Sequence, residues 1–142
     1  MSTVIGLDHG SKRIGVAVGD EETRLAFARP ALLRRNVASD LAQIAGLAAA
    51  EHARRVVVGL PRNMDGSEGS QAAAARAFGA QLSAIGLEVV FVDERLTSWQ
   101  AGEQLAASGR RPERGSGEKD SAAARLILQE WLDLRRPDDP TA

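Results

Sequence analysis

The chain has 142 residues, of which 44% are hydrophobic and 26% are charged, which suits one globular domain with a single core. It contains no cysteine, so disulfides, thiolate metal sites and a cysteine nucleophile are excluded. The formal net charge of -1 argues against a protein that coats nucleic acid through overall positive charge, although basic residues can still cluster locally. No apolar run reaches the about 18 residues of a membrane span, and we expect a soluble cytoplasmic protein.

Short apolar runs predict the strands of a sheet. Three of them have the composition of parallel strands buried on both faces; they are TVIGLD (3–8), RVVVGL (55–60) and EVVFVD (88–93). RIGVAV (13–18) follows the first run after only HGSK, which is too short for a crossover helix and predicts an antiparallel hairpin. A further strand is expected within 25–33, where Pro30 suits an edge position.

Helical periodicity follows in the later part of the chain. Apolar residues recur at helical spacing in 37–52, 70–85 and 120–134, which predicts three amphipathic helices. Thr97 and Gln100 have the spacing of a capping box, so another helix is expected to begin there and to end before Gly109. The order of elements indicates an α/β sandwich with a mixed sheet.

Two acids stand at predicted strand ends, and a third stands at a helix start. Asp8 closes the first strand and Glu94 follows the last, which is the edge where open α/β sheets bind ligands. Asp120 begins a helix that could pack across that edge. Three carboxylates there would repel by roughly 4 kcal/mol per pair at about 4 Å and an effective dielectric of about 20. Mg²⁺ or Mn²⁺ would remove this repulsion, and the pattern predicts metal-activated attack on a phosphate.

Each acid also has a structural interpretation. Asp8 could bond its own backbone in a turn, Glu94 could be a solvated residue of a first helical turn, and Asp120 could be a helix cap. Their joint placement is more informative than any one of them, but periodicity leaves open whether they converge.

Four segments resemble the signature blocks of the bacterial YqgF/RuvX family, in the same order and over nearly the whole chain. They are IGLDHGSKRIGVAVGD (5–20), VVVGLPRNMDGSEG (56–69), VDERLTSWQA (92–101) and EKDSAAARLILQEWL (118–132). The resemblance implies a ribonuclease H-like, three-layer α/β sandwich. Its mixed five-stranded sheet would have strands one to three antiparallel and strands one, four and five parallel.

The resemblance also carries an activity. It places the family's catalytic and metal-binding triad on Asp8, Glu94 and Asp120 and implies a divalent-metal-dependent hydrolase. The favoured substrate is precursor 16S ribosomal RNA, processed during ribosome biogenesis, and the alternative is a Holliday junction resolvase acting on four-way DNA. Partners would be structured RNA or branched DNA and no membrane, with the protein a monomer or a homodimer. We expect one nuclease domain over residues 1–136 and a disordered tail over 137–142.

Basic and polar residues near the motifs are candidate contacts to nucleic acid. Some neighbour the acids or follow the fourth strand, and others lie in a Gly-, Ser- and Pro-containing stretch that suits a mobile arm; they are Lys12, Arg13, Asn63, Arg95, Arg110, Arg111, Arg114 and Lys119. Each could instead be solvated or ion-paired. His9, a small departure from the family pattern, could donate to a phosphate or be a surface-turn residue, and His52 suits a solvated helix end.

Two other functional classes remain open. Sugar-kinase and actin-like ATPases share the fold and a similar turn after the first strand, but they enclose ATP between two such domains and this chain has the length of one. A non-catalytic RNA-binding domain would keep the acids for structural reasons.

Overall fold

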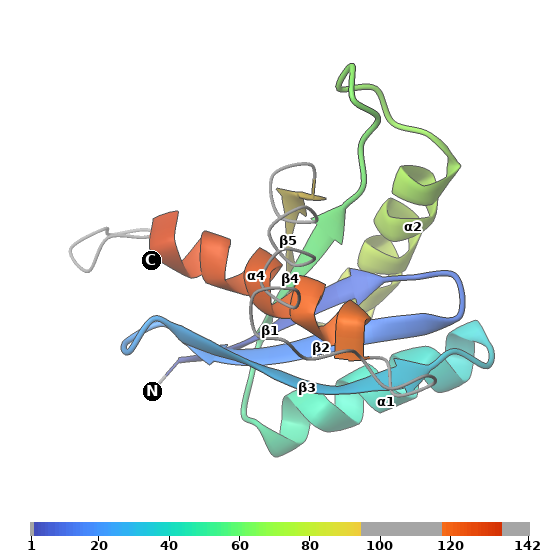
Figure 1. Cartoon of the computed structure of the whole chain (residues 1–142). Helices are drawn as coiled ribbons and strands as arrows, with labels where there is room; N and C mark the ends of the chain where they lie inside the picture. The colour runs from blue at the N-terminus through green and yellow to red at the C-terminus, as the bar shows by residue number, and fades with distance from the viewer. Residues whose placement is uncertain (1, 95–117, 135–142) are drawn as a thin grey trace.

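The computed structural model describes residues 2–94 and 118–134, and for residues 118–120 it describes only the course of the backbone. A five-stranded sheet with strand order β3-β2-β1-β4-β5 forms its centre (Figure 1). The elements are β1 (Thr3–His9), β2 (Arg13–Asp20), β3 (Leu25–Leu33), α1 (Val37–Ala50), β4 (Arg55–Leu60), α2 (Ser70–Ala84), β5 (Glu88–Asp93) and α4 (Glu118–Leu134).

Strand directions confirm the mixed sheet predicted from the sequence. β1 pairs antiparallel with β2, and β2 pairs antiparallel with β3. β1 pairs parallel with β4, and β4 pairs parallel with β5. The carboxyl ends of β1, β4 and β5 therefore meet at one edge of the sheet, because parallel strands run in the same direction.

Alternation along the strands divides the core into two layers, one on each face of the sheet. Ile5 and Leu7 of β1 pack with α1 and α2 in one core. Val4 of β1 and Val57 of β4 pack with α4 in the other. Because successive strand residues point to opposite faces, Gly6 and Asp8 lie on the α4 face and His9 lies on the α2 face. The fold is thus the expected three-layer sandwich (Figure 1).

Glycine on β1 lets α4 lie close to the sheet. A Cβ atom built on Gly6 would stand 2.7 Å from Leu128 Cβ and 3.0 Å from the Ala124 carbonyl oxygen, closer than packed atoms tolerate. A side chain here would push α4 away from the strands whose ends carry the candidate site.

The helices begin and end close to their predicted positions. α1 ends at Ala50, two residues before the predicted end, and His52 takes a φ of 55° that a helix cannot continue through. The Asn36 side chain accepts a hydrogen bond from Ser39 N at 2.8 Å and caps the start of this helix. α4 begins at Glu118, two residues earlier than predicted. In 2–94 and 118–134 no helix is both long and apolar enough to cross a membrane.

Candidate active site

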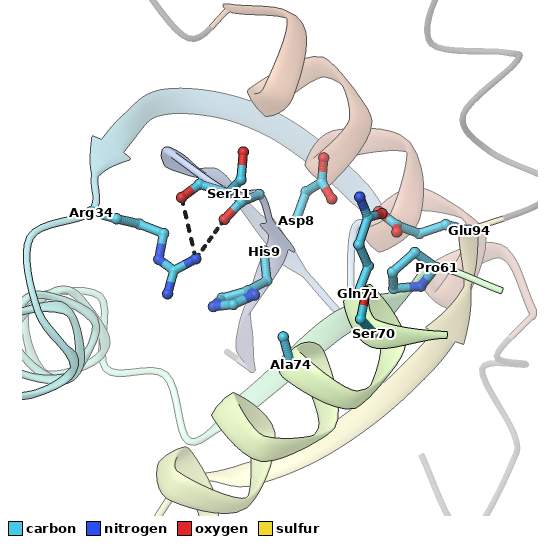
Figure 2. Close-up of a pocket in the computed structure, with 10 residues that line it drawn as sticks. Asp8, His9, Ser11, Arg34, Pro61, Ser70, Gln71, Ala74 and Glu94 are labelled. Carbon is cyan, nitrogen blue, oxygen red and sulfur yellow. Dashed lines mark hydrogen bonds between the residues drawn. The ribbon is translucent and has the colours of Figure 1, made fainter. Parts of the chain in front are cut away.

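Asp8 and Glu94 meet at the carboxyl edge of the parallel strands, as strand-end reasoning predicted. Asp8 lies near the end of β1, and Glu94 directly follows β5, with β4 between them. Both carboxylates line a cavity of about 280 Å³ at this edge (Figure 2). Asp8 and Glu94 are more than eighty residues apart in the sequence. They come together because β4 pairs in parallel with both β1 and β5.

Gly59 of β4 provides the space that the Glu94 side chain occupies. A Cβ atom at Gly59 would lie 2.8 Å from Glu94 Oε1 and 2.5 Å from Ile127 Cδ1. Any other residue would displace either the carboxylate or α4. Gly59 lies within the strand predicted over 55–60, but its position beneath Glu94 was not predicted.

Glu94 is the poorly solvated member of the carboxylate pair, and Asp8 is only partly buried. Glu94 is only 9% exposed and forms a side-chain hydrogen bond with Asp8. Burial, then this hydrogen bond and the negative charges of Asp8 and Asp93, raise the pKa of Glu94 to about 9. At neutral pH one carboxyl group of the pair therefore keeps a proton, unless a cation takes its place.

Ser121 attaches the start of α4 to the sheet. Ile14 pairs with Leu32 and Val16 pairs with Arg29, so β3 contains a bulge opposite Gly15. The buried Ser121 hydroxyl, in a residue that is 2% exposed, donates to the Arg29 carbonyl oxygen at 2.5 Å. It also accepts a longer, weaker bond of 3.5 Å from Val16 N.

This attachment lies next to the carboxylate pair. Gly15, which precedes Val16, is the residue that pairs with Asp8 across β1 and β2. The first turn of α4, which contains Asp120, is therefore held over the strands that lead to Asp8. The side chain of Asp120 lies outside the described part of the structure.

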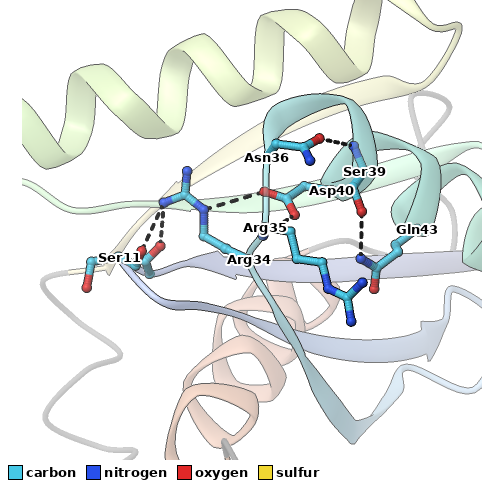
Figure 3. A network of polar contacts seen from close by, with 8 residues as sticks. Ser11, Arg34, Arg35, Asn36, Ser39, Asp40 and Gln43 are labelled. Carbon is cyan, nitrogen blue, oxygen red and sulfur yellow. Dashed lines mark hydrogen bonds and ion pairs between the residues drawn. The ribbon is translucent and has the colours of Figure 1, made fainter.

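The opposite wall of the cavity is built around Arg34. Its Nη1 donates to the carbonyl oxygens of Gly10 at 2.9 Å and Ser11 at 3.4 Å, and its Nε lies 3.6 Å from Asp40 Oδ2. Asp40, buried at the start of α1, also accepts from Arg35 N at 3.1 Å (Figure 3). These contacts fix the β1–β2 turn directly after Asp8 and His9. Neither Arg34 nor Asp40 was among the site residues predicted from the sequence.

Comparison with known proteins identifies the family. Residues 2–134 match the RuvX family, described as Holliday junction resolvase. The chain belongs to the RuvX family. It is 46% identical over 133 residues to the "Putative pre-16S rRNA nuclease" of Synechococcus elongatus, covering 93% of this chain and 89% of that protein. A protein of the same name from Anaeromyxobacter dehalogenans is 47% identical over 134 residues, covering 94% of this chain and 98% of the relative.

Solved structures resemble this RuvX protein in fold. The yeast mitochondrial Holliday junction resolvase superimposes with a TM-score of 0.58 at 13% identity, covering 92% of this chain and 78% of the other. Thermus thermophilus RuvC in complex with a Holliday junction substrate gives a TM-score of 0.54 at 15% identity, covering 89% and 92%. These likenesses confirm the ribonuclease H-like architecture.

The remaining predicted contacts lie around the site or outside the described residues. Lys12 is exposed in the β1–β2 turn and Arg13 begins β2, and neither lines the cavity. Asn63 is exposed and hydrogen-bonds Ser67 in the β4–α2 loop, and it too lies outside the cavity lining. Lys119 lies in the first turn of α4. Four predicted contacts lie outside the described residues: Arg95, Arg110, Arg111 and Arg114. The helix predicted to begin at Thr97 lies outside them as well.

Within the described side chains, Asp8 and Glu94 are a pair. No group of three or more acids, histidines or cysteines there comes together as a metal site. Completing the predicted triad therefore depends on Asp120, whose backbone position alone is described.

The shared proton makes the stability of the metal-free protein depend on pH. Because the pKa of Glu94 rises from 4.5 to about 9 on folding, the folded state binds a proton that the unfolded state releases between these values. Stability from this group is complete below the unfolded pKa and is lost as pH rises toward the folded one. Urea unfolding in EDTA should show wild type weakening relative to Glu94→Gln across this window. Parallel pH profiles for the two proteins would contradict the shared proton.

Ser121→Ala should destabilise the protein by about 1–3 kcal/mol, because it leaves the Arg29 carbonyl and the Val16 amide without their buried partner. Urea unfolding at one pH measures this loss. The matched control is Ser83→Ala, at an exposed serine in α2, which should change stability by no more than about 0.5 kcal/mol. Equal effects at the two serines would show that the bridge to the bulge contributes nothing.

Proposed function

We propose that this RuvX-family nuclease hydrolyses phosphodiester bonds of precursor 16S ribosomal RNA, using Asp8, Glu94 and Asp120 to bind Mg²⁺ or Mn²⁺. The observation that carries the proposal is the Asp8–Glu94 pair. Two carboxyl groups, the buried Glu94 and the partly buried Asp8, are held together at the ligand-binding edge of the sheet. Such a pair is costly without a cation and favourable with one.

The donor set suits a hard divalent cation. Oxygen ligands from carboxylates are those that Mg²⁺ and Mn²⁺ prefer. The cation would supply the Lewis acidity that activates water and stabilises the leaving oxygen in phosphodiester hydrolysis. The protein's own contribution is to hold the two carboxyl groups close together and to shield Glu94 from bulk water. Gly59 and the parallel strands do so by fixing where Glu94 can lie.

Asp120 is proposed as the third ligand from its place in the chain. It precedes Ser121, whose hydroxyl bridges β2 and β3 beside the Gly15–Asp8 pair. α4 lies on the face of the sheet toward which Asp8 and Gly59 point. The family resemblance assigns the same residue, so position and resemblance agree.

The choice of RNA rests on the names of the relatives. Proteins that share 46–47% identity with this chain are named for pre-16S ribosomal RNA. A four-way DNA junction is the second candidate, favoured by the family description and by the fold shared with structures of junction resolvases. A resolvase cuts two strands symmetrically and would need two paired sites, hence a dimer.

Substrate contacts by the basic residues are part of the same proposal. Lys12 and Arg13 lie in and after the turn that follows Asp8, close in the chain to a carboxylate that would bind the cation. Asn63 belongs to the β4–α2 loop at the same edge. The other proposed contacts are Arg95, Arg110, Arg111, Arg114 and Lys119, and we propose that the arginines of 110–114 form an arm whose charge binds phosphates.

Replacing each acid should abolish cleavage. Asp8→Asn, Glu94→Gln and Asp120→Asn should each lower the cleavage rate at least about 100-fold, because even residues that only support metal ligands cost about 10–100-fold. The measurement uses Mg²⁺ or Mn²⁺ with labelled precursor 16S ends, single-stranded RNA and a four-way DNA junction. Preference for the precursor over the junction supports the proposed substrate, and the reverse preference supports the resolvase.

The control for Asp120 is Asp133→Asn in the same helix. Asp133 is exposed near the opposite end of α4 and contacts Gln129, so its loss should leave cleavage unchanged. Full activity of Asp120→Asn would remove this residue from the triad. Binding of RNA with no cleavage by wild type under any metal would favour the non-catalytic RNA-binding domain.

A further inference from the structure

The active-site cavity extends past the carboxylates onto the α2 side of the sheet. Beyond Asp8 and Glu94 its walls include His9 from β1, Pro61 after β4, and Gln71 and Ala74 from the first turns of α2 (Figure 2). The metal-binding proposal uses only the carboxylate end. The cavity has a volume of about 280 Å³, and the part of it on the α2 side has no role in the metal-binding proposal.

His9 forms a fixed aromatic wall of this space. Strand alternation turns it away from Asp8, toward α2, where its ring stacks on Phe78 with centroids 4.7 Å apart and an interplanar angle of 29°. Phe78 is only 4% exposed, so it backs the imidazole with a packed side chain. The ring therefore has a defined place beside the carboxylates before any substrate arrives.

The imidazole gives this part of the cavity an aromatic face, and its ring nitrogens can form hydrogen bonds. Aromatic side chains of this kind stack on the flat faces of unpaired bases. The wall therefore has the shape and chemistry that suit a nucleobase.

We infer that this part of the cavity binds one unpaired nucleobase, that of a nucleotide next to the scissile phosphate, against the His9 ring. The inference rests on the proposed nuclease function and deepens it by naming a base subsite. A phosphate held at Asp8 through a cation would place its neighbouring nucleoside within reach of His9, because the two residues are adjacent in β1 and line the same cavity.

Three further residues of the wall suit a base. Ala74 and Pro61 offer apolar contact, and the Gln71 side chain offers an amide that can pair with a base edge. Arg34, the cation of this wall, directs Nη1 to the carbonyls of the β1–β2 turn and Nε toward Asp40. The guanidinium group of Arg34 therefore stabilises the β1–β2 turn, and the buried Asp40 carboxylate balances its charge.

A base subsite would make cleavage selective for single-stranded positions. A base inside a duplex is stacked and paired, so it would have to leave the helix to reach His9. Unpaired nucleotides at loops and ends present their faces and edges freely. The site would therefore favour cuts beside an unpaired nucleotide.

The chain contains only two histidines, which makes the inference directly testable by imidazole NMR. The probes are ribonucleoside 5′-monophosphates, with ribose 5-phosphate as the base-free control, all added at constant Mg²⁺. We expect the nucleotides to shift the His9 signals saturably and to leave those of His52 in place. Ribose 5-phosphate should bind about tenfold more weakly or worse, as expected when a stacking contact is lost.

Three variants distinguish the contribution of the His9 ring from that of its nitrogens and from general effects on the fold. His9→Asn removes the ring and should reduce nucleotide binding, measured for all variants by isothermal titration calorimetry, to the level of ribose 5-phosphate. His9→Phe keeps a ring against Phe78 and should retain binding within about threefold, since stacking is the larger part of the contact. His52→Asn is the matched control, because His52 is exposed with a φ of 55° that Asn tolerates.

Three results would overturn the base subsite: unmoved His9 signals up to the solubility limit of the nucleotides, equal binding of ribose 5-phosphate, or unchanged binding by His9→Asn in a folded protein. None of these readouts requires cleavage. Loss of nuclease activity in all assays together with His9-dependent nucleotide binding would overturn the proposed function and leave the subsite. An active enzyme whose nucleotide binding does not depend on His9 would overturn the subsite and leave the proposed function.

Discussion

The close approach of the Asp8 and Glu94 carboxyl groups is the constraint on which the site depends. Burial of Glu94, its hydrogen bond with Asp8 and the negative charge of Asp8 raise the pKa of Glu94 to about 9, so the protein without metal retains a proton here at neutral pH. The fold does not avoid this close approach. Parallel pairing of β1, β4 and β5 brings the strand ends together, and Gly59 leaves room for Glu94 where any larger residue would displace it. Stability is given up locally to keep an arrangement that a divalent cation would favour.

Strand alternation assigns different tasks to adjacent residues of β1. Asp8 faces α4, together with Gly6 and Gly59, and Ser121 attaches that helix to the bulge in β3. His9 faces α2 and stacks on Phe78. The sheet edge therefore has a carboxylate side and an aromatic side within one cavity. In our proposals, a substrate lying across this edge would have its phosphate at the carboxylates and one base against His9.

The sequence predicted what depends on local patterns. Apolar runs with acids at their ends placed Asp8 and Glu94 at one edge, because parallel strands leave no other place for them. The bulge in β3 opposite Gly15 and the Ser121 bridge could not be predicted, because both depend on the register of β3 against β2. The closeness of Arg34 to the turn after Asp8, and its link to Asp40, likewise depend on how α1 packs. Asp120 rests chiefly on the family resemblance, and physical reasoning adds the position of its helix turn next to the sheet edge.

Proton release on metal binding tests the central claim most directly. Isothermal titration of Mn²⁺ into the protein, repeated at neutral pH in buffers with different ionisation enthalpies, counts the protons that leave. If Asp8 and Glu94 share a proton and together bind the cation, about one proton should be released per binding event in wild type, and none in Glu94→Gln. Tight Mn²⁺ binding with no proton release, or with the same release in both proteins, would contradict the account.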